Sequence, residues 1–252
     1  MRMTETVKQL LIINVIFYIG SNYVGDMAYQ LFSLYYPENP SFRYWQPLTS
    51  MFMHAKMPNL SHILFNMFAL YSFGSALEHY WGAKKFIFFY ISCGLGASFL
   101  YLGFNYYQYH QALSLLQEAN VPLDVINAVL KEGKYNNSLL EIIPLTELEG
   151  MYHAYNTPAV GASGAIYGLL TAFAFMFPNA ELALLFIPVP IKAKYFVPGI
   201  IAIDLFLGFK GSSIFGSGGT GIAHFAHIGG ALTGFIMMWY WKKNSFNKNR
   251  WN

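Results

Sequence analysis

Cysteine and charged residues are scarce in this sequence of 252 residues, and each shortage excludes a class of protein. The single cysteine, Cys93, excludes an internal disulfide, and its apolar surroundings predict a small buried side chain. Charged residues make up 11% of the chain, whereas soluble domains have about 25%. The formal net charge of +3 is too small to indicate nucleic-acid binding.

Apolar residues take the place of the missing charges. They make up 55% of the chain, and aromatic residues alone make up 19%. Several apolar runs are long enough to cross a bilayer, which takes about 17–25 helical residues. The sequence therefore predicts an all-α polytopic membrane protein, a six-helix bundle forming one domain over residues 1–252. The expected helices are 8–28, 60–80, 84–105, 158–178, 192–210 and 222–242. The first run is interpreted as a retained helix, because no small-residue cleavage site follows it.

Lysine and arginine placement predicts the orientation of this bundle. With both termini in the cytoplasm, ten of the 15 basic residues fall in inner segments and five in outer ones. The fourth and sixth helices then both begin at the outer face.

Three outer segments have distinct compositions. Residues 29–59 are rich in aromatic side chains and are expected to form a loop in the membrane interface. Residues 106–157 form a polar insertion, with a short helix predicted near 122–132 and ended by Gly133. Residues 211–221 include five glycines and are expected to be a linker that gates the site, with Phe215 as an apolar plug.

Two polar residues stand at the heads of the fourth and sixth runs. Ser163 lies in Gly161-Ala162-Ser163-Gly164, and His227 lies in Ala226-His227-Ile228-Gly229-Gly230. Each stands one residue from a series of small residues spaced by four, which share a helix face and permit close packing in lipid. The packing series are Gly164, Gly168 and Ala172 on one helix, and Ala226, Gly230 and Gly234 on the other. Packing of these series predicts that the hydroxyl and the imidazole meet near the outer face.

This pair has the chemistry of a nucleophile and its base. Desolvation favours the neutral imidazole, which is the form that accepts a serine proton. Tyr167, four residues after Ser163, could stack on the ring. His62 and Asn66 share a helix face and are candidate oxyanion donors, together with the backbone N–H of Ser163. No carboxylate is near His227 in sequence, so a dyad is the simpler interpretation, with Asp204 left open as a distant partner.

Other membrane proteins fit less well. A zinc protease would carry a motif such as His-Glu-x-x-His, which is absent. His224 and His227 could share a metal, but no carboxylate adjoins them in sequence, so no metal or other cofactor is expected. An aspartyl protease would have to use Asp26 and Asp204, without its usual Gly-x-Gly-Asp. A transporter would more naturally place its polar groups near the midplane.

The combined motifs resemble the rhomboid family of intramembrane serine proteases, in its bacterial type. The resemblance covers about 43–105 and 158–242 and includes Trp45 with Thr49, Met53-His54, and Glu78 with Gly82. It implies that Ser163 is the nucleophile, His227 the base, His62 and Asn66 oxyanion donors, and Tyr167 a support, with Gly161 and Gly164 shaping the site.

The resemblance also implies partners and a location. The expected substrates are single-pass transmembrane proteins in the lipid bilayer, and the expected location is a bacterial cytoplasmic (inner) membrane with the active site toward the outer face. The alternative is a non-catalytic rhomboid-like protein that binds membrane proteins. Gln46 replaces the arginine that often follows the family's loop tryptophan, which leaves the anchoring of that loop open.

Overall fold

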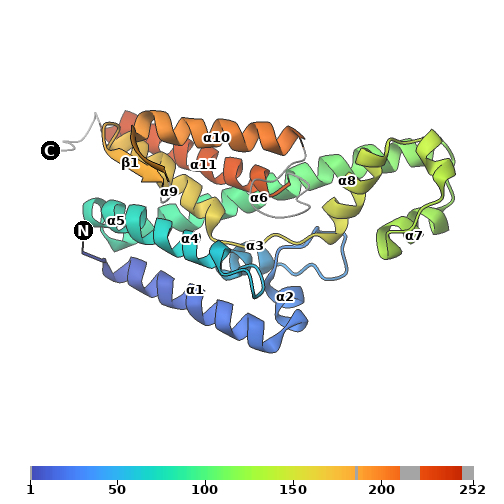
Figure 1. The fold of residues 1–252 in the computed structure, drawn as a ribbon, viewed down its shortest axis with the longest axis horizontal. Coiled ribbons are helices and arrows are strands. Elements are labelled where there is room, and N and C mark those ends of the chain that lie inside the picture. The colour runs from blue at the N-terminus through green and yellow to red at the C-terminus, as the bar shows by residue number, and fades with distance from the viewer. Residues whose placement is uncertain (1, 185–186, 211–221, 246–252) are drawn as a thin grey trace.

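The computed structural model describes residues 2–184, 187–210 and 222–245, and helices dominate it (Figure 1). Within these residues, two helices are long and apolar enough to cross a membrane by length and composition, α1 (Glu5–Val24) and α6 (Ala83–Glu118), and α9 (Ser163–Met176) is a shorter apolar helix. The remaining helices are α2 (Asp26–Phe32), α3 (Gln46–Thr49), η1 (Ser50–Phe52), α4 (Ser61–Ala69), η2 (Leu70–Gly74), α5 (Ser75–Trp81), α7 (Leu123–Glu132), η3 (Asn137–Glu141), α8 (Leu145–Asn156), α10 (Ala193–Lys210) and α11 (Ile222–Ser245).

The observed helices correct several predicted boundaries. The run predicted as 8–28 breaks at Gly25, whose φ of 77° suits glycine and separates α1 from α2. The run 60–80 is a continuous helix made of α4, the π-helical turn η2 and α5. The run 84–105 continues as α6 to Glu118, and the run 158–178 is helical only from Ser163. The all-α prediction is wrong between α9 and α10, where β1 (Glu181–Leu184) and β2 (Ile187–Lys192) form an antiparallel hairpin.

Helices α6, α9 and α11 pack together at the centre of the molecule. Glycines permit the approach: a Cβ on Gly234 would lie 2.9 Å from the Gly168 Cα atom, and one on Gly229 would lie 2.7 Å from the Gly96 carbonyl oxygen. Gly164 and Gly168 also face Ala97 and Cys93 of α6. The predicted contact between the small-residue series of α9 and α11 is confirmed, and α6 joins it as a third helix.

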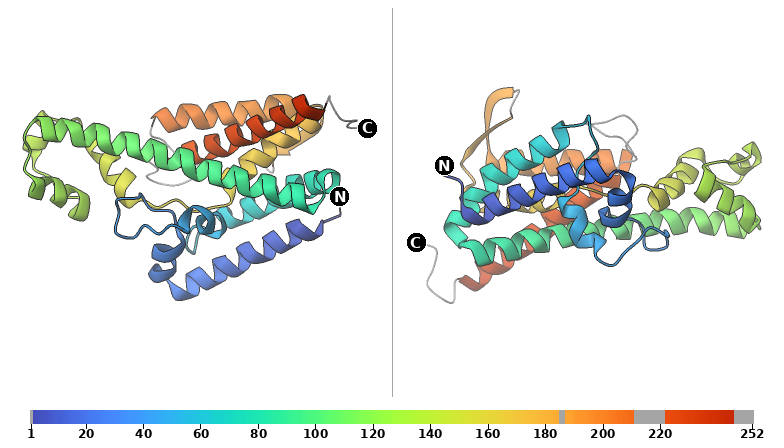
Figure 2. Two further views of the ribbon diagram at one scale, coloured as in Figure 1. Left: turned by 180° about the vertical axis from the view of Figure 1, so that it is seen from behind. Right: turned by 90° about the horizontal axis from the view of Figure 1, so that it is seen from below.

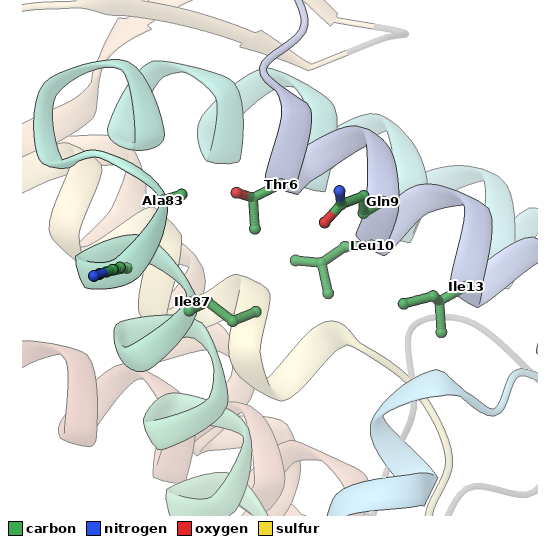
Figure 3. A pocket seen from close by; sticks show the side chains of 7 residues that line it. Thr6, Gln9, Leu10, Ile13, Ala83 and Ile87 are labelled. Carbon is green, nitrogen blue, oxygen red and sulfur yellow. The ribbon is translucent and has the colours of Figure 1, made fainter.

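The first helix is held at its start by a carboxylate from α5. Glu78 accepts hydrogen bonds from the backbone N–H groups of Thr6 (3.1 Å) and Val7 (3.0 Å) and from the hydroxyl of Thr4. The first N–H groups of a helix have no acceptor within the helix, so Glu78 supplies one from another helix. A groove lies between α1 and α6. It is lined by Thr6, Gln9, Leu10, Ile13, Ala83, Lys84 and Ile87 (Figure 3).

The insertion 106–157 is an ordered helical unit on the extension of α6. The start of α1 and the end of α11 lie at one end of the helices, and α7 and α8 lie toward the other (Figures 1 and 2). The predicted helix near 122–132 is confirmed as α7, which ends at Gly133 in the left-handed conformation. Buried Tyr109, Leu116 and Ile126 form a hydrophobic cluster that also includes Leu34 and Tyr36 of the first loop. The insertion therefore packs directly on that loop.

Candidate active site

The segment before Ser163 is held in an extended form by the first loop. Leu34 and Ala159 exchange two backbone hydrogen bonds of 2.9 Å, and the Gly161 N–H donates to the Ser50 carbonyl oxygen at 2.9 Å. Extended residues cannot continue a helix backwards, so α9 begins at Ser163. The N–H groups of its first turn, including that of Ser163, therefore have no acceptor within the helix.

Gly161 allows this segment to pass close to His62. Its φ of 126° is a conformation that side-chain-bearing residues rarely adopt. A Cβ at this position would lie 3.0 Å from both Cε1 and Nε2 of His62 and 3.5 Å from the Ser163 Oγ atom. Because Gly161 has no side chain, the edge of the His62 imidazole and the Ser163 hydroxyl can both lie close to it.

Ser163 and His227 meet at the junction of α9 and α11. The Ser163 Oγ atom lies 2.9 Å from the His227 Nε2 atom, within hydrogen-bond distance. Both side chains are half-buried, so the pair is partly shielded and still reachable from outside. The predicted proximity of the hydroxyl and the imidazole is confirmed.

Tyr167 lies flat against the His227 ring. The ring centroids are 4.3 Å apart and the ring planes differ by 9°, which is a stacked arrangement. The geometry fixes the plane in which His227 presents its two nitrogen atoms. The predicted stacking is therefore confirmed.

His62 and Asn66 both belong to α4, and their hydrogen bonds differ. The His62 Nδ1 atom accepts from the Ala55 N–H at 3.1 Å, so the neutral ring carries its proton on Nε2, the atom beside Gly161. Asn66 Nδ2 donates to the carbonyl oxygen of His62 at 2.7 Å. One amide hydrogen of Asn66 remains for another acceptor.

The structure places Asp204, which the sequence left open as a distant partner, beside His227. Asp204 of α10 is buried, its Oδ1 atom accepts a direct hydrogen bond from His224 Nδ1, and its Oδ2 atom lies 3.4 Å from His227 Nδ1. Asp204, His224 and His227 each offer one potential metal-ligand atom, and these three atoms lie within 4.8 Å of one another. No carboxylate is near these histidines in sequence, but Asp204 is near them in space because α10 packs beside α11. Asp26, the other candidate of an aspartyl site, instead pairs on the surface with Lys56.

Gln46 anchors the first loop in place of an arginine. The side chain is buried, its Oε1 atom accepts from the Tyr35 N–H at 3.2 Å, and its Nε2 atom donates to the carbonyl oxygens of Gln30 (2.9 Å) and Ser41 (2.7 Å). Trp45 Nε1 donates to the Leu31 carbonyl oxygen at 2.8 Å. The anchoring left open by the sequence is thus provided by hydrogen bonds to backbone. The predicted gate at 211–221, with Phe215, lies outside the described residues.

Comparison with known proteins identifies the class to which this fold and site belong. The Rhomboid domain model matches residues 41–244, and the chain therefore belongs to the rhomboid family. An uncharacterised mitochondrial rhomboid protein of Schizosaccharomyces pombe is 27% identical over 218 residues, which cover 81% of this chain and 53% of that protein. Mitochondrial Rhomboid protein 1 of Saccharomyces cerevisiae is 25% identical over 187 residues (72% of this chain, 38% of that protein). The human mitochondrial presenilin-associated rhomboid-like protein is 27% identical over 198 residues (77% and 36%).

These relatives correct the predicted location and limit which of their properties can be assigned to this chain. The chain spans about half or less of their length. Each is named as a mitochondrial protein, which contradicts the expected bacterial cytoplasmic membrane.

Proposed function

We propose that this chain is an intramembrane serine endopeptidase that hydrolyses peptide bonds in or near transmembrane segments. The observation that carries the proposal is the 2.9 Å approach of Ser163 Oγ to His227 Nε2 in a chain of the rhomboid family. A hydroxyl within hydrogen-bond reach of an oriented imidazole is the arrangement of an activated serine nucleophile.

The proposed reaction gives each group one role. Ser163 attacks the scissile carbonyl while its proton passes to Nε2 of His227, which later protonates the leaving amine. The His62 Nε2–H and the Ser163 N–H donate to the oxyanion, and Asn66 adds its second amide hydrogen. Water then hydrolyses the acyl-enzyme, with His227 acting again as base. No cofactor takes part in these steps.

The membrane arrangement belongs to the same proposal. The helices α1, α4–α5, α6, α9, α10 and α11 would be the six spans. At about 1.5 Å per residue, α6 exceeds a bilayer core of about 30 Å, so its second half would stand outside with the insertion. The exposed side chains of Tyr44 and Trp45 suit a first loop in the membrane interface. Single-pass membrane proteins would enter from the lipid, and the names of the relatives support a mitochondrial membrane as the location.

Fluorophosphonate labelling of the purified protein in lipid tests the proposal without requiring a known substrate. Wild-type protein should be labelled at Ser163, whereas Ser163→Ala should be neither labelled nor able to cleave a transmembrane substrate. His227→Ala should lose nearly all of both activities, and the double variant should be little worse, because residues that act as a unit are not additive. Folded wild-type protein that neither labels nor cleaves would favour the non-catalytic alternative.

A further inference from the structure

We propose that Asp204 is a positioning residue that fixes the tautomer of His227, with His224 holding the opposite edge of the carboxylate. The proposal rests on the proposed serine-protease function. It adds a carboxylate, Asp204, that supports the dyad of Ser163 and His227. It assigns a role to α10, which otherwise contributes no group to the reaction.

The first argument is the pairing of two buried atoms. His227 Nδ1 and Asp204 Oδ2 have no hydrogen-bond partner of their own in the described part of the chain, and they lie 3.4 Å apart. Buried polar atoms without partners are costly, and a small closure would satisfy both at once. An ionised carboxylate can only accept hydrogen bonds, so the bond must run from Nδ1–H of His227 to Oδ2 of Asp204.

The second argument is that the other oxygen of Asp204 is held in place by His224. Its Oδ1 atom accepts a direct hydrogen bond from His224 Nδ1. Gly208, one turn after Asp204, allows this approach: a Cβ there would lie 3.3 Å from the Cβ atom of His224. A carboxylate with one oxygen fixed can aim the other oxygen at His227.

The consequence for the reaction concerns His227 alone. With Nδ1 carrying the proton, Nε2 presents its lone pair to the Ser163 hydroxyl, as a base must. When Nε2 takes the serine proton, the buried negative charge of Asp204 stabilises the imidazolium. Asp204 touches neither the substrate nor the nucleophile, and it keeps its own charge throughout.

The principal experiment compares Asp204→Asn with Asp124→Asn, which removes a carboxylate from α7. Both variants are assayed in lipid vesicles with one transmembrane substrate, and their thermal unfolding is measured. Asp204→Asn should lower kcat by about 10²-fold or more with KM nearly unchanged, because loss of the orienting carboxylate in serine proteases costs about 10⁴-fold. Asp124→Asn should match wild type. A folded Asp204→Asn with kcat within about threefold of wild type would overturn the proposal, and so would wild-type activity that is lost in EDTA and restored by zinc.

A second readout does not depend on activity. Protein labelled with ¹⁵N-histidine shows in its NMR spectrum which ring nitrogen of His227 carries the proton, assigned by the signal lost in His227→Gln. Wild type should carry it on Nδ1, and Asp204→Asn should shift it toward Nε2; an unchanged tautomer would overturn the role of Asp204. If the tautomer shifts but the wild type proves inactive, the proposed function fails while the positioning role of Asp204 stands.

Discussion

The glycine contact between α9 and α11 gives a prediction whose size follows from the structure. A Cβ on Gly230 would overlap the Gly164 carbonyl group and lie 2.6 Å from its carbonyl carbon. Unbonded carbon atoms need about 3.5 Å, so Gly230→Ala should push the two helices apart by roughly 1 Å. Overpacking of this kind costs about 1–3 kcal/mol, and the gain of alanine over glycine in a helix offsets only about 0.5–1 kcal/mol. We expect a net loss of stability.

The same displacement should weaken the site more than the fold. Gly230 is three residues from His227, so the movement lengthens the distance between Ser163 Oγ and His227 Nε2. A misplacement of about 1 Å can cost about 10²-fold in rate. The assays are thermal unfolding in lipid and the rate of fluorophosphonate labelling. Gly103→Ala in α6 is the matched control, because no atom lies within 4 Å of its added Cβ. Gly230→Ala with wild-type unfolding and wild-type labelling would refute the packing argument.

Three further predictions test the supports of the site. Gln46→Ala should lower the free energy of unfolding by about 2–4 kcal/mol and slow labelling, since it removes three hydrogen bonds made by a buried side chain. Wild-type protease resistance of the first loop would contradict this. Glu78→Ala should destabilise the protein by about 2–4 kcal/mol in thermal unfolding, because the first N–H groups of α1 lose their acceptor. Burial lowers the pKa of His54 to about 4, so the folded protein holds this ring neutral. Its contribution to stability is therefore full above pH 6.5 and is lost as the pH falls toward 4. His54→Gln should reduce the fall of Tm over that range, and His79→Gln at an exposed position should leave the fall unchanged.

The helices and the serine–histidine pair were predictable because their signals are local. Apolar runs located the helices, and small residues four apart placed Gly164 and Gly168 against Gly230 and Gly234. Ser163 and His227 stand beside these residues, so packing the helices brought the two side chains together. The same logic could have included α6, because Cys93 and Ala97, which face Gly168 and Gly164, are also small residues four apart.

The missed features depend on contacts between distant parts of the chain. The start of α9 at Ser163 is set by Leu34, which pairs with Ala159 and keeps the preceding residues extended. Asp204 reaches His227 only because α10 packs beside α11, and no spacing within either helix encodes that contact. The β1–β2 pair lies between the predicted helices 158–178 and 192–210, in a segment for which the sequence predicted no regular element.

The two halves of the proposed site are supported by partly different contacts. Ser163 is positioned through the backbone of Ala159, which is bound to Leu34, and Leu34 belongs to the hydrophobic cluster of the insertion. Tyr36 extends this connection, because its ring packs 5.2 Å from Tyr109 of α6. His227 is instead positioned by glycine packing within α11 and by groups on α9 and α10. Loosening the insertion should therefore displace the nucleophile. It should also disturb the base, because Ala226, the neighbour of His227, packs against the same hydrophobic cluster.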